Sequence, residues 1–369
     1  MQFEIQKNTL LKPLQLLANV VERRQTHPIL GNILFILKDD DLSLTGTDSE
    51  VELIIHLKLD KFYDPLEITV PARKLMDICR SFSEEALLTF RVEESKIILT
   101  SGRSRFSLMT LPAIDFPKVA SELKGLRLKS SANALRSLFE QTAFAMAQND
   151  VRSFLNGTLI HVNKQTLTVV STDGHRLALS KQSLLSELSE QLNIIVPRKG
   201  VSEIQHLLLD KEEMEITLSF DNQHIRLETE EFTLTSKLID GRYPDYQKVI
   251  PKQSHLSVSV DRDLLKAALT RVSILSNEKA RGVRLEFRQG YMRLLSNNPD
   301  QEQAEDEIEI DYAGEPLDMS FNINYLLDVL GVLGAGLITI QLTDAAGSAL
   351  IEQPQTHPNA LYVVMPMRL

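Results

Sequence analysis

The sequence predicts an α+β protein built from three repeated domains, each with two helices packed on antiparallel sheets. Three sets of landmarks recur along the chain at an interval of 125 or 126 residues. They are the polar residues Asp48, Asp173 and Asn298, the glycines Gly31, Gly157 and Gly282, and the strand-to-helix residues Pro71, Pro197 and Asn322. We therefore expect an N-terminal domain over 1–125, a central domain over 126–252 and a C-terminal domain over 253–369.

Each third shows the same order of elements. Apolar spacing of three and four residues predicts helices over 10–21, 72–80, 133–146, 198–208, 263–275 and 322–331. Alternating strands over 104–112, 231–239 and 360–367 are expected to close the three units. Asp48, Asp173 and Asn298 each follow an apolar run, where an Asp or Asn side chain can bond the backbone two residues on and form an Asx turn.

The composition is that of a soluble globular protein. Of 369 residues, 43% are hydrophobic and 24% are charged, and the only cysteine, Cys79, falls in a helical pattern where we expect a buried thiol. The segment from Val329 to Ile340 is too short to cross a bilayer, and Gly334 and Gly336 suggest that a helix there gives way to a strand. We expect a cytoplasmic protein without a disulfide or a membrane span.

The stretch VVSTDGHRLAL at 169–179 contains side chains of the kind found in hydrolases. No nucleophile elbow, phosphate-binding loop or zinc-binding spacing accompanies it, and Asp173 belongs to the repeat whereas His175 occurs in one copy only. Binding is therefore favoured over catalysis, with a hydrolase using Asp173 and His175 as the alternative. The acidic run 300–312 could be a solvated strand, a metal site or a partner for basic residues of the first third.

Positive charge is concentrated in the predicted helices. The net charge of the chain is −10. The helical segments with their flanking residues, counted over 5–24, 72–80, 132–147, 198–208, 263–274 and 322–331, together carry +6, and the remainder carries −16. This division suggests that the helices share a surface that faces phosphate. Because +6 is small for tight binding, such a protein would be held on DNA by its shape rather than by affinity. A protein scaffold that never meets DNA is the other alternative.

Many short motifs along the whole chain resemble the beta subunits of bacterial DNA polymerase III, the family of sliding clamps. They include LKPL (11–14), PILGN (28–32), VPARK (70–74), SGRSRFSL (101–108), TDGHRLA (172–178), TSKLIDGRYPDY (235–246), ILSNEKARGVRL (274–285) and YVVMPMRL (362–369). The resemblance implies a head-to-tail homodimer that forms a six-domain ring around double-stranded DNA. It implies a non-catalytic processivity factor without cofactor or metal, whose partners are the clamp loader complex, the polymerase catalytic subunit and other clamp-binding proteins of repair and replication.

The resemblance also implies a pocket for partner peptides between the second and third repeated units. Its residues would be Leu155, Thr172, Gly174, His175, Arg176, Leu177, Pro244, Lys248, Val249, Asn322, Tyr325, Ser348, Val363, Val364, Met365, Pro366, Met367, Arg368 and Leu369. Leu, Val, Met and Pro would supply an adaptable apolar trough. Relatives are expected to carry larger side chains at Ala280 and Ala346, so that the trough is wider here.

Two further sets of residues follow from the same resemblance. DNA contacts are expected from Arg24, Arg73, Gln148, Asn149, Arg152, Arg198 and Lys199, with a weaker contribution from Ser153 and Phe154 in place of phenolic side chains. The dimer interface is expected from Phe106 and Leu108 against Ile274 and Leu275, and from Lys74, Arg103 and Arg105 against Asp300, Glu302, Glu305 and Asp306. At such an interface the apolar contact should contribute more than exposed ion pairs.

Overall fold

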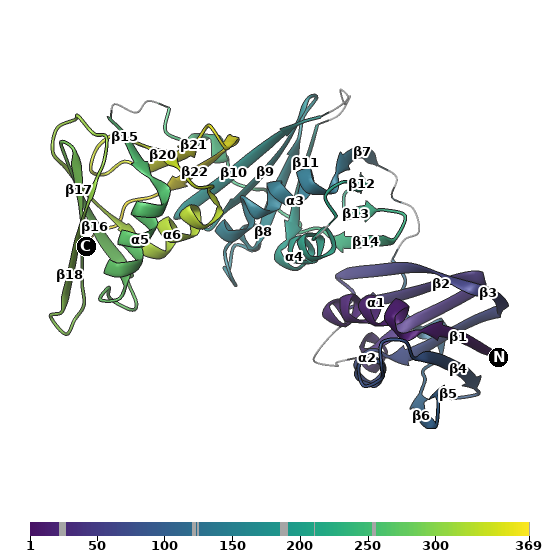
Figure 1. The fold of residues 1–369 in the computed structure, drawn as a ribbon. Coiled ribbons are helices and arrows are strands. Elements are labelled where there is room, and N and C mark those ends of the chain that lie inside the picture. Colours follow the sequence, from purple (N-terminus) through teal and green to yellow (C-terminus); the bar gives the residue numbers. More distant parts are fainter. Residues whose placement is uncertain are drawn as a thin grey trace. The chain divides into compact units, whose positions relative to one another are not determined.

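The structure is a computed structural model that describes residues 1–21, 27–119, 123, 125–184, 191–209, 211–252 and 256–368. Its described residues contain six α-helices and 22 strands, and these strands pair in antiparallel sheets (Figure 1). Contacts divide the chain into two compact units, one of Met1–Asn133 with Ser202–Leu238 and one of Ala134–Val201 with Ile239–Leu369. The two units are described separately.

The first unit contains two antiparallel sheets. The four-stranded sheet has the order β1-β4-β5-β6, and the six-stranded sheet has the order β2-β3-β14-β13-β12-β7. The strands of the first sheet are β1 (Gln2–Gln6), β4 (Leu87–Glu93), β5 (Lys96–Ser101) and β6 (Ser104–Met109). Those of the second are β2 (Asn32–Thr47), β3 (Val51–Pro71), β7 (Leu126–Ser131), β12 (Glu215–Phe220), β13 (His224–Glu228) and β14 (Phe232–Lys237).

Helices α1 (Lys7–Val20) and α2 (Ala72–Arg80) contact each other, and α1 also packs against β2 and β3 (Figure 1). Leu10, Leu14 and Leu17 recur at helical spacing on α1 and are fully buried, so this apolar face of the helix is turned into the core. Cys79 on α2 is also fully buried, and burial raises the pKa of its thiol to about 12. The expectation of a buried thiol is confirmed.

The second unit contains an eight-stranded and a four-stranded sheet. Their orders are β11-β8-β9-β10-β22-β21-β20-β15 and β18-β17-β16-β19. The strands of the larger sheet are β8 (Gly157–Val162), β9 (Thr166–Thr172), β10 (Arg176–Ser183), β11 (Leu192–Pro197), β15 (Leu256–Asp261), β20 (Leu337–Leu342), β21 (Ala349–Gln353) and β22 (His357–Val364). Those of the smaller sheet are β16 (Gly282–Arg288), β17 (Tyr291–Asn297), β18 (Gln303–Glu309) and β19 (Leu317–Asn322).

The remaining helices are α3 (Ala132–Glu140), α4 (Arg198–Leu207), α5 (Arg262–Ser273) and α6 (Ile323–Val332). The helix predicted over 133–146 is therefore too long. The Thr142 hydroxyl donates to the Leu138 carbonyl at 2.7 Å, and a separate 3₁₀ turn (Ala143–Ala145) follows. Side-chain competition for a helical carbonyl is a physical reason for the early end.

The three predicted Asx turns are confirmed. Asp48 Oδ1 accepts hydrogen bonds from the Glu50 and Val51 amides at 3.0 and 2.8 Å. Asp173 Oδ1 accepts from the amides of residues 175 and 176 at 2.9 and 3.0 Å, and Asn298 Oδ1 accepts from the Asp300 amide at 3.0 Å. The recurrent polar position is thus a turn that ends one strand and starts the next in each third.

The predicted change from helix to strand near Gly336 is also confirmed. Helix α6 ends at Val332, β20 begins at Leu337, and Gly336 has a φ of +104°, a conformation that favours glycine. The side chain of Gln353 holds this turn, because its Oε1 accepts from the Gly334 amide and its Nε2 donates to the Gly334 carbonyl.

Glu52 is a buried carboxylate in the six-stranded sheet. It is 4% exposed, lies opposite Thr235 on β14, and its Oε2 accepts from the Val119 amide at 3.1 Å. Burial raises the pKa of this carboxyl above its ordinary value, although the Val119 amide and the charge of Arg226 oppose the shift. The folded state therefore binds this proton more tightly than the unfolded state.

We predict that Glu52→Gln leaves the free energy of unfolding at pH 7 unchanged or higher. Because the folded pKa is raised, the stability that Glu52 contributes is complete below its unfolded pKa and is lost as pH rises through its folded pKa. Urea unfolding at pH 4.5 and pH 7 measures this, with the exposed neighbour Glu50→Gln as the control for losing one charge. The prediction would be contradicted if Glu52→Gln lowered the free energy of unfolding, relative to wild type, by more at pH 7 than at pH 4.5.

Candidate functional site

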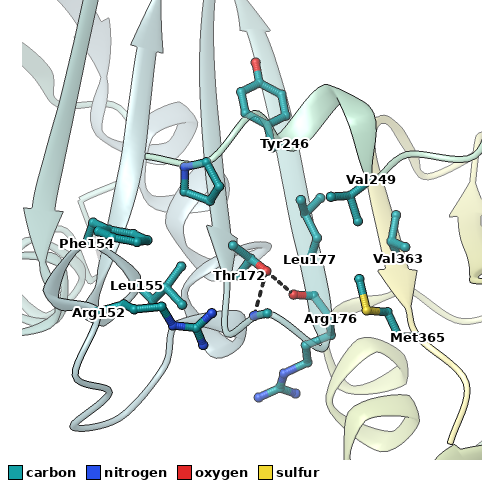
Figure 2. A pocket seen from close by; sticks show the side chains of 12 residues that line it. Arg152, Phe154, Leu155, Thr172, Arg176, Leu177, Tyr246, Val249, Val363 and Met365 are labelled. Carbon is teal, nitrogen blue, oxygen red and sulfur yellow. Dashed lines mark hydrogen bonds between the residues drawn. The ribbon is translucent and has the colours of Figure 1, made fainter. Parts of the chain in front are cut away.

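An apolar cavity of about 210 Å³ opens in the second unit (Figure 2). Its walls come from four segments that are far apart in the sequence. The lining residues are Arg152, Phe154, Leu155, Thr172, Gly174, Arg176, Leu177, Pro244, Tyr246, Val249, Val363 and Met365. Most of these side chains are apolar, so the cavity suits apolar groups of a ligand.

The floor of the cavity is formed by neighbouring strands of the eight-stranded sheet. Strand β10 pairs with β9 on one side and β22 on the other, so that Leu177 lies opposite both Thr172 and Val363. Leu177 and Val363 are almost fully buried in a cluster against which Phe154, Tyr246 and Val249 also pack. The floor is therefore part of a hydrophobic core and is fixed by it.

The turn between β9 and β10 forms the edge of the cavity. The Thr172 hydroxyl donates to the Arg176 carbonyl at 2.5 Å and accepts from the Gly174 amide at 3.1 Å (Figure 2). Gly174 has a φ of +91°, and a Cβ at this position would lie 3.3 Å from a guanidinium nitrogen of Arg152. Both the backbone conformation and the close approach favour glycine.

Arg176 is held by several partners at once. Its guanidinium is paired with Asp173 at 3.0 Å and Asp328 at 2.5 Å, and it donates to the Phe144 carbonyl at 2.9 Å. It also lies over the Tyr325 ring, 4.5 Å from the centroid. With its side chain only 10% exposed, Arg176 joins the turn to α6 and contributes a fixed wall rather than a free charge.

Asp173 and His175 do not form a catalytic pair. One oxygen of Asp173 closes the turn and the other binds Arg176, while the His175 ring stacks on Tyr325 with 6.4 Å between centroids. The hydrolase alternative is not supported by this arrangement. The described residues also contain no group of three or more His, Cys, Asp or Glu side chains that could hold a metal ion.

Arg152 stands on the other side of the cavity. It pairs with Asp150 at 2.9 Å, and hydrogen bonds from Arg152 lower the pKa of the Asp150 carboxyl to about 2. The pair thus stays ionised at neutral pH. Arg152 was predicted to contact DNA, but the structure places it in the lining of the cavity.

Nine of the residues predicted for the pocket line this cavity, namely Leu155, Thr172, Gly174, Arg176, Leu177, Pro244, Val249, Val363 and Met365. Other predicted residues lie around it. Tyr325 and His175 stack on each other, and Lys248 is 81% exposed and paired with Asp245. The Asn322 side chain caps α6, Val364 is fully buried, and the Met367 amide donates to the Ser320 carbonyl.

Ser348, Pro366 and Met367 are half-buried and Arg368 is exposed, whereas Leu369 lies outside the described residues. The two positions predicted to widen the trough, Ala280 and Ala346, are half-buried and exposed, and neither lines this cavity. Tyr246, Phe154 and Arg152 line it without having been assigned to the pocket. Tyr246 is adjacent to predicted residues and could have been found from its position in the PDY motif.

The residues predicted to contact DNA differ in their exposure and in whether they are bonded within the chain. Arg24 lies outside the described residues, and Arg73, Gln148, Asn149 and Ser153 are exposed. Lys199 is half-buried on the first turn of α4. Arg198 donates to the Met146 carbonyl at 2.8 Å and the Ala147 carbonyl at 3.2 Å, so it is already engaged within the chain.

The residues predicted for the dimer interface lie on two edge strands and the end of a helix. Strand β6 ends one four-stranded sheet and carries Arg105, Phe106 and Leu108. Arg103 directly precedes this strand, and Lys74 lies on α2. Strand β18 ends the other four-stranded sheet and carries Glu305 and Asp306. Exposed edge strands are surfaces on which a further strand can pair.

The apolar residues of this set differ in how exposed they are, and the acidic residues differ in whether they have partners within the chain. Ile274 directly follows α5 and is 77% exposed, and Leu275 is half-buried. Asp306 is paired with Arg271 at 2.6 Å and Glu305 with Arg293, whereas Asp300 and Glu302 are exposed in the turn before β18. Two of the four predicted acidic residues thus have basic partners within the chain, and Glu302 accepts a hydrogen bond from Asn298 Nδ2 at 2.6 Å.

Comparisons with known proteins cover the whole chain. Family models match three consecutive segments: the N-terminal domain of the DNA polymerase III beta subunit over residues 1–120, its central domain over 129–245 and its C-terminal domain over 247–368. The chain is 50% identical over 369 residues to a beta sliding clamp of Pseudomonas putida and 42% identical to that of Escherichia coli, with full coverage of both sequences in each case.

Solved structures give the same result. The crystal structure of the DNA polymerase III beta subunit of Pseudomonas aeruginosa is similar with a TM-score of 0.97 and 48% identity, covering 100% of both chains. A second structure from that organism, a sliding clamp bound to griselimycin, also has a TM-score of 0.97. No helix in the described part of the chain is long and apolar enough to span a membrane.

Proposed function

Because the chain belongs to the DNA polymerase III beta subunit family, we propose that it is a DNA sliding clamp, a non-catalytic processivity factor that encircles duplex DNA and tethers its polymerase. The observation that carries the proposal is the match of all three family domains, in order, together with relatives named beta sliding clamps that are covered from end to end. Because the fold alone could serve many functions, the proposal rests on the sequence identity to these relatives over the full length.

Ring closure requires a second copy of the chain. We propose that β6 of one protomer meets β18 of its partner head to tail, which joins two four-stranded sheets across each of two interfaces. The basic residues near β6 and the acidic residues of β18 have complementary charge. Phe106, which packs edge-on against Phe82 with 5.9 Å between centroids, and Ile274 would provide the apolar contact.

Duplex DNA would pass through the ring without being read in sequence. The helical segments carry a net charge of +6 within an acidic chain, so they would face the phosphates while the rest of the surface repels them. Arg73 is exposed on α2 and Gln148 and Asn149 are exposed between α3 and β8, which suits contacts to the backbone. The three domains would follow the predicted boundaries at residues 125 and 252.

The cavity beside Thr172 and Leu177 would receive apolar side chains of partner peptides. Proposed partners are the clamp loader, the polymerase catalytic subunit and repair proteins, all of which would compete for this site. Griselimycin, which is bound to a Pseudomonas aeruginosa relative, is a compound to test for the same site. These tasks place the protein in the cytoplasm with the chromosome.

Retention on DNA tests the proposal. The chain is loaded by its clamp loader onto a nicked circular plasmid, and the complex is then linearised with a restriction enzyme. We expect retention through gel filtration on the circle and loss of most of the protein after linearisation, because encirclement substitutes for affinity. Equal retention on both forms would contradict a topological clamp, and absence from both, with an active loader, would favour a DNA-independent scaffold.

A further inference from the structure

Residues 147–156, which we call the wall loop, carry Arg152, Phe154 and Leu155 to the cavity. The wall loop is closed by its own hydrogen bonds. The Ala147 amide donates to the Leu155 carbonyl at 2.9 Å. The Asn156 side chain binds the Asp150 backbone twice: its Oδ1 accepts from the Asp150 amide at 2.9 Å, and its Nδ2 donates to the Asp150 carbonyl at 2.8 Å. These bonds set the shape of the loop but do not fix it to the rest of the unit.

The two ends of the wall loop are held by consecutive residues. At the C-terminal end, Gly157 pairs with Pro197 in the register of β8 and β11. At the N-terminal end, Arg198 donates one guanidinium nitrogen to the carbonyls of Met146 and Ala147. In the described part of the chain no other donor reaches these two carbonyls, although Met146 is 4% and Ala147 is 7% exposed.

Arg198 is therefore placed where a buried pair of carbonyls needs a donor. It is half-buried, and burial followed by the positive charge of Arg176 lowers the pKa of its guanidinium. Arg176 satisfies the neighbouring Phe144 carbonyl in the same way, so two like charges converge on residues 144–147. Such an arrangement persists when the bonds to the carbonyls outweigh the repulsion.

We propose that Arg198 is a positioning residue for the partner pocket: by holding the Met146 and Ala147 carbonyls, it fixes the wall loop and with it the Arg152 side of the cavity. This inference rests on the proposed function only in taking the cavity as a peptide site. It reassigns Arg198 from the expected phosphate contact to a support of the pocket, whose lining does not include Arg198 itself.

The test is Arg198→Met, which keeps an unbranched apolar stem but removes the guanidinium and its donors. Binding of a fluorescein-labelled peptide with Leu and Phe side chains is measured without DNA, where a phosphate contact has no role. We expect the dissociation constant to rise about 10-fold, the size of effect typical for residues that act through a connected network. Lys181→Met, on an exposed position of β10, loses the same charge and is expected to bind the peptide as wild type does.

A second measurement reports on the loop itself. The chain contains no Trp, and Val151 at the tip of the wall loop is fully exposed, so Val151→Trp provides the only tryptophan. In that background, Arg198→Met is expected to lower the tryptophan anisotropy while the midpoint of thermal unfolding shows that the protein is folded. If the Met variant does not fold, Arg198→Lys replaces it, with a smaller loss of about 3-fold expected because an ammonium lacks the planar fork of guanidinium.

Unchanged peptide affinity and unchanged anisotropy in a folded Arg198 variant would overturn the inference and return Arg198 to a phosphate contact. If the wild-type chain itself does not bind the peptide, the pocket proposal fails, and the anisotropy alone then decides whether Arg198 holds the loop. A drop in anisotropy supports the positioning role in that case, and no drop refutes it.

Discussion

Replacing Ile274 by Asp is expected to convert the proposed dimer into monomers and to abolish retention on circular DNA. Ile274 is 77% exposed at the end of α5, so the substitution leaves the core of the protomer intact. Burying an Ile side chain contributes about 1.5–3 kcal/mol relative to leaving it exposed. A carboxylate left unpaired in the interface costs a further amount of about 1–3 kcal/mol.

The loss counts twice, because a closed head-to-tail ring contains two identical interfaces. A total of about 5 kcal/mol or more would raise the dissociation constant on the order of 10³-fold. Sedimentation velocity across a range of concentrations measures this directly. Leu264→Asp, at an exposed apolar position on the same helix, is the control and should remain dimeric. An Ile274→Asp protein that sediments as wild type would place the interface elsewhere.

The ionic part of the interface should matter less. Asp306 and Glu305 are already paired with Arg271 and Arg293 of their own chain, so a partner's basic residue would have to compete for them. Exposed ion pairs typically contribute less than about 1 kcal/mol and are weakened by salt. Arg105→Glu is therefore the companion variant, and we expect it to shift the dimer equilibrium far less than Ile274→Asp.

The repeat was the part of the fold that could be predicted most directly from the sequence. Asp48, Asp173 and Asn298 act through bonds to amides two or three residues away, so a local pattern is enough to predict their turns. The helices were predicted because apolar residues recur at fixed spacing. Where the prediction was wrong, at the end of the helix that starts at Ala132, the Thr142 hydroxyl competes for a carbonyl, which spacing does not reveal.

The site was predictable only in part, because the partners of its charged residues are set by the folded chain. Arg152 and Arg198 are basic residues near an expected DNA surface, and nothing in their local sequence shows that one lines a cavity and the other bonds two carbonyls. The same holds for Arg176, whose contact with Asp328 spans 152 residues of sequence. Charged residues can be counted from a sequence, whereas the groups that pair with them are known only from the structure.

Met365→Ala is expected to weaken partner-peptide binding about 5- to 30-fold, whereas Met367→Ala should change it less than about 2-fold. Met365 lines the cavity, so its removal takes away a flexible apolar contact of the kind that contributes about 1–2 kcal/mol at a binding site. Met367 lies outside the cavity lining, and its amide donates to the Ser320 carbonyl. Two residues of the same type, two positions apart, thus form a matched pair.

Neither substitution should alter the backbone that places these residues. The Met365 amide donates to the His175 carbonyl at 2.9 Å, and Val364 pairs with β10 and β21, so the end of β22 keeps its register when either side chain is shortened. Fluorescence anisotropy of the labelled Leu- and Phe-containing peptide gives both affinities, and sedimentation confirms that both variants keep the wild-type oligomeric state. Equal losses in the two variants would mean that peptide binds along the tail rather than in the cavity, because Met365 lines the cavity and Met367 does not.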